Sequence, residues 1–523
     1  MGAKGRQDGS TLQNWERKIE DRMNRWTSEA DTGHVGSVVS IDATPVNPAN
    51  AGKKVLFLNA NETMRPYRVA PLGLAFVASA TEAAGHEVRF VDFPESKSQL
   101  RGYRQTIVDW APDYLGVGIR NLDNSDFHAF ESYLCEPSRL VREARLAKPG
   151  IRVLLGGPAA TVDPQLVMQR VQPDHVVLGE GEDSLPQVIR RLESGERLPE
   201  VIGACDSTDT PFRVTDVTRL PAPRLYQWVD NLRPYLRGDA GYPLQTKRGC
   251  PLKCSYCTYG RIEGTRYRFL DANSIADEVE GAMARGIRDF EFVDSTFNLP
   301  PHHAMKVLGA LKERGLTANY VGTGLNPSKL PNELLATMRE IGFRSVILTA
   351  ESASDTMLAS YQKNYKRSRL FEAADLLERN DIIGLWVFLI GGPCETAETV
   401  EETLSFIEER IHPPQAVYIT SGIRVYPGSP IADDANSGLF AKEDLRRRSD
   451  LPGLDFFYSN GTPPDWLEAR LRRFQAQHPH VMLSCEGHSA LTQVALRIMN
   501  LLPFRKPYWQ YIPALNRVRR MAW

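Results

Sequence analysis

The sequence predicts an α/β protein with two regions of alternating strands and helices, followed by a small, mainly helical C-terminal domain. Short apolar runs alternate with stretches of helical spacing between residues 53 and 200, and the same alternation returns between 241 and 435. Strands that alternate with helices form parallel sheets. The chain has 523 residues, which is too long for one core, so several domains are expected.

Composition narrows the class of protein. The formal net charge is -1, so we expect no bulk binding of nucleic acid. The seven cysteines are odd in number and three are clustered, which favours a reducing cytoplasm over a disulfide framework. The chain has no apolar run of about 18 residues and begins with polar residues. We therefore expect a soluble, cytoplasmic protein.

Residues 1–52 form an N-terminal extension that is rich in polar residues, with an amphipathic helix predicted from Leu12 to about Trp26. The pattern changes at Lys53, where the first domain (53–200) begins. Five apolar runs there are predicted as strands: 55–58, 88–91, 114–119, 153–155 and 175–178. With helical stretches between them, they predict a doubly wound, Rossmann-like sheet.

A doubly wound sheet binds its ligand beyond the carboxyl ends of its strands. Two glycine-rich loops stand there, Gly156-Gly-Pro158 and Gly179-Glu-Gly-Glu182. Glycine lets the backbone approach a bulky ligand closely. Neither loop matches GxGxxG or a P-loop, and strand-to-helix turns often contain glycine, so the loops alone are weak evidence for a ligand.

Three cysteines follow a linker (201–240), in the run Cys250-Pro-Leu-Lys-Cys254-Ser-Tyr-Cys257. The segment before them, 241–249, reads as a short strand that ends in a glycine turn, which places the cysteines on a loop. Three thiolates leave one iron of a four-iron cluster free to bind another molecule. A zinc site is the alternative, but no fourth ligand stands at zinc-finger spacing.

The region 241–435 contains five more predicted strands: 290–293, 319–322, 345–349, 385–390 and 416–420. Together with the strand before the cysteines they make six. Each is followed by a loop and usually by a helix, which predicts a second parallel sheet.

The CxxxCxxC spacing, with Tyr256 before the last cysteine, resembles the radical S-adenosylmethionine (SAM) enzymes. The glycine-rich loops ahead of it resemble the cobalamin-binding (B12-binding) branch, which includes the class B methyltransferases. The resemblance implies a partial (β/α)6 barrel over 241–435. It also implies a [4Fe-4S] cluster on Cys250, Cys254 and Cys257, SAM at the free iron, and cobalamin on the first domain.

The resemblance implies SAM contacts from five residues: Tyr256, Asp294, Glu351, Gly391 and Gly392. Glu351 would contact the ribose or amino group of SAM, and Tyr256 and the two glycines would line its adenine. Asp294 would orient the active-site loop or the substrate.

The implied cobalamin contacts lie at the strand ends of the first domain: Asn59, Arg65, Tyr67, Arg120, Asn121, Gly156, Gly157, Pro158, Gly179, Glu180, Gly181 and Glu182. The chain has no DxHxxG motif, and His128, the nearest histidine, is interpreted as an ordinary helix residue. We therefore expect base-off cobalamin without a protein histidine ligand. Arg65, Tyr67 and Arg120 are the candidates to lie under the cobalt.

The resemblance implies a methyltransferase that acts on an unactivated carbon or phosphorus centre through a 5'-deoxyadenosyl radical and methylcobalamin. Ring contraction, cyclisation or rearrangement without methyl transfer is the alternative within the family. A non-catalytic corrinoid or iron-sulfur regulator is an alternative of another class. We expect a small-molecule or carrier-bound substrate from a biosynthetic pathway, and an external low-potential electron donor of the flavodoxin or ferredoxin type.

Residues 436–523 form the C-terminal domain, which we expect to contact the substrate. A helix with a basic face is predicted from Trp466 to Phe474, and another from Leu491 to Leu502. The tail from Pro503 to Pro513 combines aromatic and cationic residues. Such a tail either packs on its own protein, which we favour, or contacts a membrane surface.

Overall fold

A computed structural model describes residues 52–61, 68–128, 130–236, 241–437, 444–447, 455–484 and 509. All of them belong to one unit, Pro48–Trp523. The predicted helices Leu12–Trp26 and Leu491–Leu502 lie outside the described residues, as do Arg65 and Tyr67.

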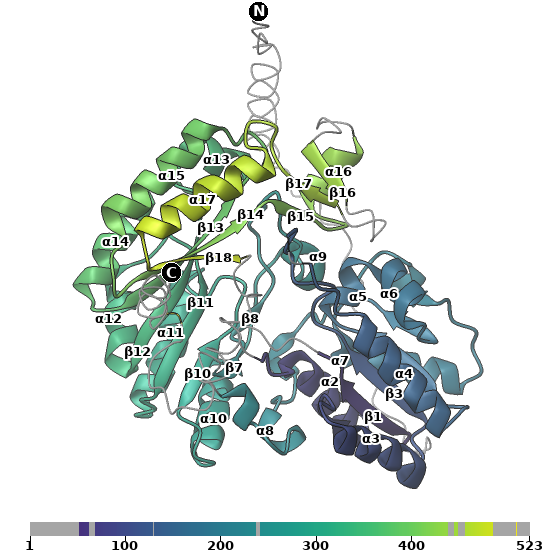
Figure 1. Cartoon of the computed structure of the whole chain (residues 1–523). Helices are drawn as coiled ribbons and strands as arrows, with labels where there is room; N and C mark the ends of the chain where they lie inside the picture. Colours follow the sequence, from purple (N-terminus) through teal and green to yellow (C-terminus); the bar gives the residue numbers. More distant parts are fainter. Residues whose placement is uncertain are drawn as a thin grey trace, which may run out of the picture. The chain divides into compact units, whose positions relative to one another are not determined.

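The first sheet, which contains the strands labelled β1 and β3 in Figure 1, has six parallel strands in the described part of the chain, in the order β2-β1-β3-β4-β5-β6. The strands are β1 (Lys54–Asn59), β2 (Glu87–Val91), β3 (Tyr114–Gly118), β4 (Arg152–Gly156), β5 (His175–Val177) and β6 (Val201–Ile202). The order reverses at β1, which pairs with both β2 and β3. The predicted doubly wound sheet is therefore confirmed, with its switch point beside β1. Strand β6 extends it slightly into the segment predicted as a linker.

Helices cover both faces of this sheet. They are α2 (Leu72–Ala83), α3 (Lys97–Trp110), α4 (Cys135–Ala147), α5 (Pro158–Val162), α6 (Pro164–Val171) and α7 (Gly181–Glu193). Apolar residues of α3, α4, α5 and α6 form one core cluster with the strands, and those of α2 and α7 form another on the opposite side. Because both faces are covered, the central strands β1, β3 and β4 are buried along most of their length, whereas the edge strand β2 alternates, with Glu87 and Arg89 exposed.

The second sheet has seven parallel strands among the described residues, in the order β18-β14-β13-β12-β11-β10-β7. They are β7 (Tyr242–Leu244), β10 (Asp289–Phe292), β11 (Asn319–Leu325), β12 (Phe343–Glu351), β13 (Ile383–Ile390), β14 (Ala416–Ser421) and β18 (Val481–Leu483). The first six confirm the predicted strands of the partial barrel.

The helices of the second region return the chain between these strands and share its core. They are α10 (Ala272–Met283), α11 (Pro301–Glu313), α12 (Asn332–Ile341), α14 (Ser368–Arg379), α15 (Ala397–Arg410) and α17 (Pro464–Gln477). Shorter elements are η1 (Ala204–Asp206), η2 (Val217–Arg219), α8 (Leu225–Trp228), η3 (Arg233–Tyr235), β8 (Lys247–Arg248), α9 (Tyr259–Glu263), β9 (Arg268–Phe269), α13 (Asp355–Ser360) and α16 (Pro430–Asn436).

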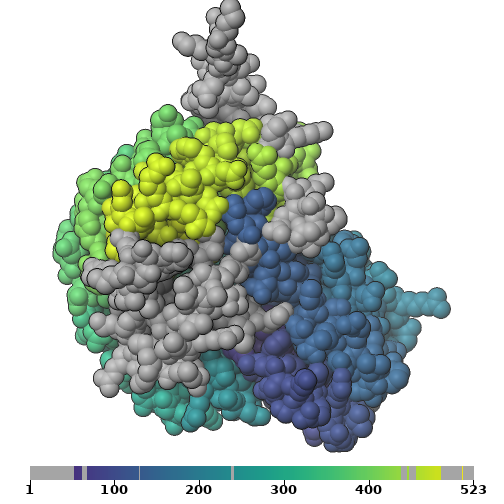
Figure 2. All heavy atoms as spheres, in the orientation of Figure 1, coloured from purple at the N-terminus to yellow at the C-terminus, as the bar shows by residue number. Residues whose placement is uncertain are grey.

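The C-terminal region is less helical than the sequence predicts, as far as the structure describes it. Its strands β16 (Leu445–Arg447) and β17 (Asp455–Phe457) form an antiparallel sheet with β15 (Ile423–Val425). Strand β18 joins the barrel sheet beside β14, and α17 lies at the surface over it (yellow in Figure 2). Strands of three residues are too short to show alternation in a sequence. No helix among the described residues is long and apolar enough to cross a membrane.

Candidate active site

The cysteine loop begins at a turn that only glycine can make. Gly249 follows β8 with φ +85°, and a Cβ there would lie 2.0 Å from the carbonyl oxygen of Arg266. The two ends of the loop meet, because Cys250 N donates to Gly264 O at 3.0 Å and β8 pairs with β9. The cysteines are thus held on a closed loop that leaves the barrel after β8.

The three thiols are suited to a cluster. Cys250 and Cys254 are buried and Cys257 is partly buried. Burial raises the pKa of each thiol, to about 12 for Cys257. A neighbouring thiolate raises the pKa of Cys250 and Cys257 further, and the Glu351 carboxylate raises that of Cys254. Thiolates in this position need a compensating cation, and iron supplies that charge as it displaces the protons.

The backbone also fits a cluster, since Tyr259 N donates to Cys257 Sγ at 3.5 Å. Amide hydrogen bonds to sulfur are typical of iron-sulfur sites. No three His, Cys, Asp or Glu side chains of the described residues converge on a single ion. Each thiolate of a four-iron cluster binds a different iron, so such convergence is not required of Cys250, Cys254 and Cys257.

A buried charged group lies beside the cysteine loop. Tyr256 Oη donates to Glu351 Oε1 at 2.6 Å, and Lys363 Nζ lies 3.2 Å from the same oxygen. Burial lowers the pKa of Lys363, but Glu351, Tyr365 and Cys254 together raise it by more, so the pKa is raised and the ammonium stays charged. Glu351 ends β12 with φ +59°, a left-handed conformation that costs a non-glycine residue about 1–2 kcal/mol. Strain of this kind is common at functional sites.

The loop after β13 is shaped by two glycines and a buried carboxyl. Gly391 has φ +99°, and a Cβ on Gly392 would lie 2.4 Å from the Tyr361 ring. Glu395 accepts from Gly391 N at 3.0 Å and from Thr399 Oγ1 at 2.5 Å. Burial raises the pKa of Glu395 to about 7. The carboxyl therefore holds the predicted adenine loop closed on itself.

Asp294 holds the turn that leads into the cysteine loop. Its carboxylate accepts from Thr246 N at 2.8 Å, Thr246 Oγ1 at 2.6 Å and Lys247 N at 3.1 Å. The Lys247 ammonium lies 3.4 Å away, and both side chains are fully buried. This position fits the predicted role in orienting the loop, while contact with SAM stays a prediction.

Those predicted cobalamin residues that the structure describes lie at the carboxyl ends of β1, β3, β4 and β5, which meet at one edge of a parallel sheet. Close backbone contacts, with Ile119 of the first domain and with Phe212 of the following segment, already require glycine at two of these positions. A Cβ on Gly157 would lie 2.5 Å from Ile119 O, and one on Gly179 would lie 2.3 Å from Phe212 O. Gly156, Pro158 and Gly181 complete the two strand-to-helix turns.

The loops after β1 and β3 are joined by side chains. Asn59 Nδ2 donates to Asp92 Oδ1 at 2.8 Å, which fixes the end of β1. Arg120 N donates to Asn61 Oδ1 at 2.9 Å, and the Arg120 side chain is exposed, followed by the half-buried Asn121.

His128 lies in a turn and not in the predicted helix, because β3 is followed by an irregular loop. Its Nδ1 lies 3.6 Å from Glu468 Oε2 of α17. The histidine thus faces a carboxylate of the barrel's outer helix.

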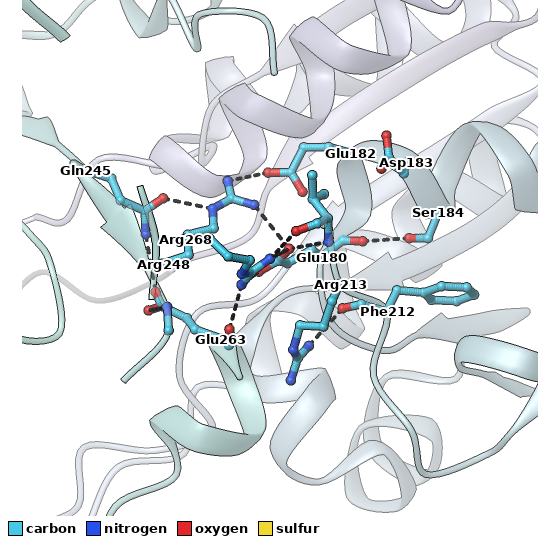
Figure 3. A network of polar contacts seen from close by, with 12 residues as sticks. Glu180, Glu182, Asp183, Ser184, Phe212, Arg213, Gln245, Arg248, Glu263 and Arg268 are labelled. Carbon is cyan, nitrogen blue, oxygen red and sulfur yellow. Dashed lines mark hydrogen bonds and ion pairs between the residues drawn. The ribbon is translucent and has the colours of Figure 1, made fainter. Parts of the chain in front are cut away.

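The carboxylates of Glu180 and Glu182 form ion pairs with arginines of the barrel region. Glu180 accepts from Arg268, and Glu182 accepts from Arg248 (Figure 3). A contact of either carboxylate with cobalamin stays a prediction, and their observed contacts join the first domain to the β8–β9 strand pair.

Sequence reasoning did not find Lys363 or Glu395. Lys363 follows Glu351 by 12 residues, across α13, and no local pattern marks it. Glu395 ends the loop that begins with Gly391 and Gly392. The glycine pair in the sequence could therefore have pointed to Glu395 as a residue that shapes this loop.

Comparison with known proteins identifies the class. Residues 244–407 match the radical SAM superfamily, and residues 63–189 match the B12 binding domain. The chain therefore belongs to the cobalamin-dependent radical SAM enzymes, and the predicted family is confirmed. Its cofactors are a [4Fe-4S] cluster, SAM and cobalamin.

Similar proteins include methyltransferases and cyclases. An uncharacterized methyltransferase of Pyrococcus horikoshii is 26% identical over 352 residues, which cover 65% of this chain and 73% of that protein. Tryptophan 2-C-methyltransferase of Streptomyces laurentii is 25% identical over 429 residues (68% and 70%). The anaerobic magnesium-protoporphyrin IX monomethyl ester cyclase of Rubrivivax gelatinosus is 24% identical over 372 residues (67% and 64%).

Two solved structures share the fold. The radical SAM methyltransferase TsrM of Kitasatospora setae, with cobalamin and a [4Fe-4S] cluster bound, aligns with a TM-score of 0.76 at 22% identity, over 90% of this chain and 100% of that one. OxsB with aqua-cobalamin and SAM bound aligns with a TM-score of 0.63 at 13% identity, over 90% and 75%.

Proposed function

We propose that this enzyme transfers a methyl group to an unactivated carbon or phosphorus centre of a biosynthetic intermediate. One observation carries the proposal: the cysteine loop adjoins the predicted cobalamin loops. Helix α9 begins two residues after Cys257 and packs on α5, which follows Gly157. Arg261 Nε of α9 donates to Thr161 O of α5 at 2.9 Å. An iron-sulfur cluster and a cobalamin bound at these loops would share one active site.

The side chains around the cysteine loop have distinct tasks in this proposal. When bound, the cluster and SAM supply a 5'-deoxyadenosyl radical, and cobalamin supplies a methyl group. The Lys363 ammonium is placed to bind the SAM carboxylate, and Glu351 is placed to accept from its amino or ribose groups. Tyr256 holds Glu351 in its strained conformation by a hydrogen bond. Burial of these groups keeps water from a radical.

The substrate in this proposal is a small molecule or a carrier-bound group, and an external low-potential protein delivers the electrons. The C-terminal domain, 436–523, is the proposed source of substrate contacts. Named relatives act on tryptophan, a hopanoid and a cytidylyl phosphonate. Their variety supports a shared cofactor apparatus with separately evolved substrate contacts.

Cyclisation without methyl transfer is the second candidate, because three cyclases are among the similar proteins. SAM with a trideuterated methyl group separates the two, and no substrate is needed. The protein is reconstituted anaerobically with iron, sulfide and hydroxocobalamin, then mixed with labelled SAM and a low-potential reductant. Methyl transfer predicts trideuteromethyl-cobalamin and S-adenosylhomocysteine. Bound cobalamin that stays unlabelled while SAM is cleaved would favour cyclisation, and bound SAM without any turnover would favour a regulator.

A further inference from the structure

A buried network of ion pairs joins the Gly179–Glu182 loop of the first sheet to the strands that carry the cysteine loop (Figure 3). Arg248 Nη2 donates to Glu182 Oε1 at 2.5 Å, and Arg248 Nη1 lies 3.6 Å from Glu180 Oε2. Arg268 Nη2 and Nη1 donate to the two Glu180 oxygens at 2.5 and 2.7 Å. Two arginines of one domain thus meet two glutamates of the other.

These charges are withdrawn from water. The side chains of Arg248, Glu180 and Glu182 are 6%, 8% and 3% exposed, and that of Arg268 is 15% exposed. The Arg248 guanidinium lies 5.1 Å from the Phe76 ring of α2, and its Nε donates to Gln245 Oε1 at 3.1 Å. These contacts hold the Arg248 guanidinium in one orientation, and the two-point contact with Glu180 does the same for Arg268.

The network holds both ends of the cysteine loop. Arg248 lies two residues before Cys250. At the other end, Arg268 Nη2 donates to Glu263 O at 2.6 Å, and Glu263 Oε2 accepts from Gly249 N at 3.1 Å. A shift of Glu180 or Glu182 would therefore be transmitted to the loop that carries the three thiols.

A buried ion pair adds little stability over well-packed apolar side chains, but it does favour one geometry over others. This network lies between the two loops that the proposed function assigns to cobalamin and to the cluster. We propose that Arg248, Arg268, Glu180 and Glu182 are positioning residues that set the distance between the cluster and the cobalt. The inference rests on the proposed function only in requiring that both cofactors bind to this chain.

Pulsed electron paramagnetic resonance tests the proposal, since it measures the distance between cob(II)alamin and the reduced cluster. The reconstituted full chain is compared with Arg248→Lys, which keeps the charge but loses the planar two-point contact. Glu182→Gln removes the charge and keeps the shape. The matched control is Asp183→Asn, because Asp183 is the next residue on α7 and its pair with Arg219 is 36% and 42% exposed. Signals are normalised to bound cobalamin and iron.

We expect one narrow distance for the unaltered protein and for Asp183→Asn, and a shifted or broadened distribution for both network variants. Should Glu182→Gln fail to fold, Arg248→Lys still decides the matter. Network variants that bind both cofactors at the unaltered distance would overturn the proposal and leave the network a purely stabilising role. An unaltered protein that binds no cobalamin would overturn the proposed function as well, which distinguishes the two failures.

Discussion

At the scale of single residues, the proposed SAM site centres on the buried pair of Lys363 and Glu351. Two opposite charges 3.2 Å apart cancel each other in a site that excludes water. The amino-acid end of SAM is zwitterionic, so its carboxylate and ammonium can exchange into the pair without adding net charge at that point. Tyr256 then remains as the neutral donor beside them, because burial raises its pKa well above the usual range.

Lys363→Met should therefore weaken SAM binding and slow SAM cleavage by about 10- to 100-fold, the size of a lost hydrogen bond to a charged group. Iron content should not change, since the thiols remain. Binding is measured by equilibrium dialysis with labelled SAM, and cleavage by the release of 5'-deoxyadenosine. Lys366→Met, at an exposed lysine of the same segment, is the control. Equal SAM affinity in the two variants would show that Lys363 does not contact SAM.

Replacing any one of Cys250, Cys254 and Cys257 by Ala should abolish the cluster and all SAM cleavage, because two thiolates do not hold four irons. Iron and sulfide analysis after anaerobic reconstitution gives the result. Cys135→Ala, at an exposed cysteine of α4, should reconstitute as the unaltered protein does. Retained SAM cleavage in a triad variant would refute the cluster assignment.

The cysteines could be predicted because their signal is local, three thiols within eight residues. The role of Lys363 could not be predicted, because it depends on contacts with Glu351 and Tyr256, which the fold brings close from other loops. The ion pairs of Glu180 and Glu182 could not be predicted for the same reason. Their sequence context suggested a ligand, while their arginine partners lie 66 to 88 residues away.

At the scale of elements, helix α11 is tied to the turn before the cysteines by one histidine. His303 Nε2 lies 3.0 Å from Thr246 O, and the ring packs 4.4 Å from that of Phe269. Burial lowers the pKa of His303 to about 4, from 6.5 when exposed. Between these values the unfolded chain binds a proton that the folded chain does not. The free energy of unfolding should therefore fall as the pH drops from about 6.5 to 4, by up to about 3 kcal/mol.

His303→Gln keeps a donor for the Thr246 carbonyl and cannot titrate, so its stability should depend less on pH in this window. Urea unfolding of both apoproteins at pH 7.5 and 5.0 measures the difference. The same loss of stability in the two proteins would assign the acid sensitivity to other groups.

Element prediction succeeded where strands were long enough to show a pattern. All eleven predicted strands are present among the described residues, from β1 to β14. The strands β6, β9, β15, β16, β17 and β18, each of two or three residues, were missed, whereas the equally short β5 and β7 lie within longer segments that were predicted as strands. Their pairing is decided by neighbours such as β14, which Val481–Leu483 joins.

At the scale of the whole molecule, the contacts between the first domain and the barrel region could not be read from the sequence. Arg424 Nε donates to Asp123 Oδ2 at 3.2 Å across 301 residues, and the Arg248 network spans a similar junction. Such pairs require the tertiary arrangement, since neither partner has a local pattern. Each sheet was predictable, and their junction was not.

Arg248→Met should lower the free energy of unfolding by about 3–5 kcal/mol, because it leaves the Glu182 carboxylate buried without its partner. Arg219→Met, which removes an exposed ion pair with Asp183, the neighbour of Glu182, should cost less than about 1 kcal/mol. Chemical denaturation of the two apoproteins under identical conditions gives both values. Equal losses would mean that the network is open to water.

The central claim is that one chain uses a radical SAM cluster together with cobalamin, and one experiment tests it most directly. The protein is purified without oxygen, reconstituted with iron, sulfide and hydroxocobalamin, and incubated with SAM and a low-potential reductant while absorbance and products are recorded. We predict bound cobalamin, 5'-deoxyadenosine and S-adenosylhomocysteine from the same sample. SAM cleavage by a protein that binds no cobalamin would contradict the claim, because the first domain would then serve another ligand.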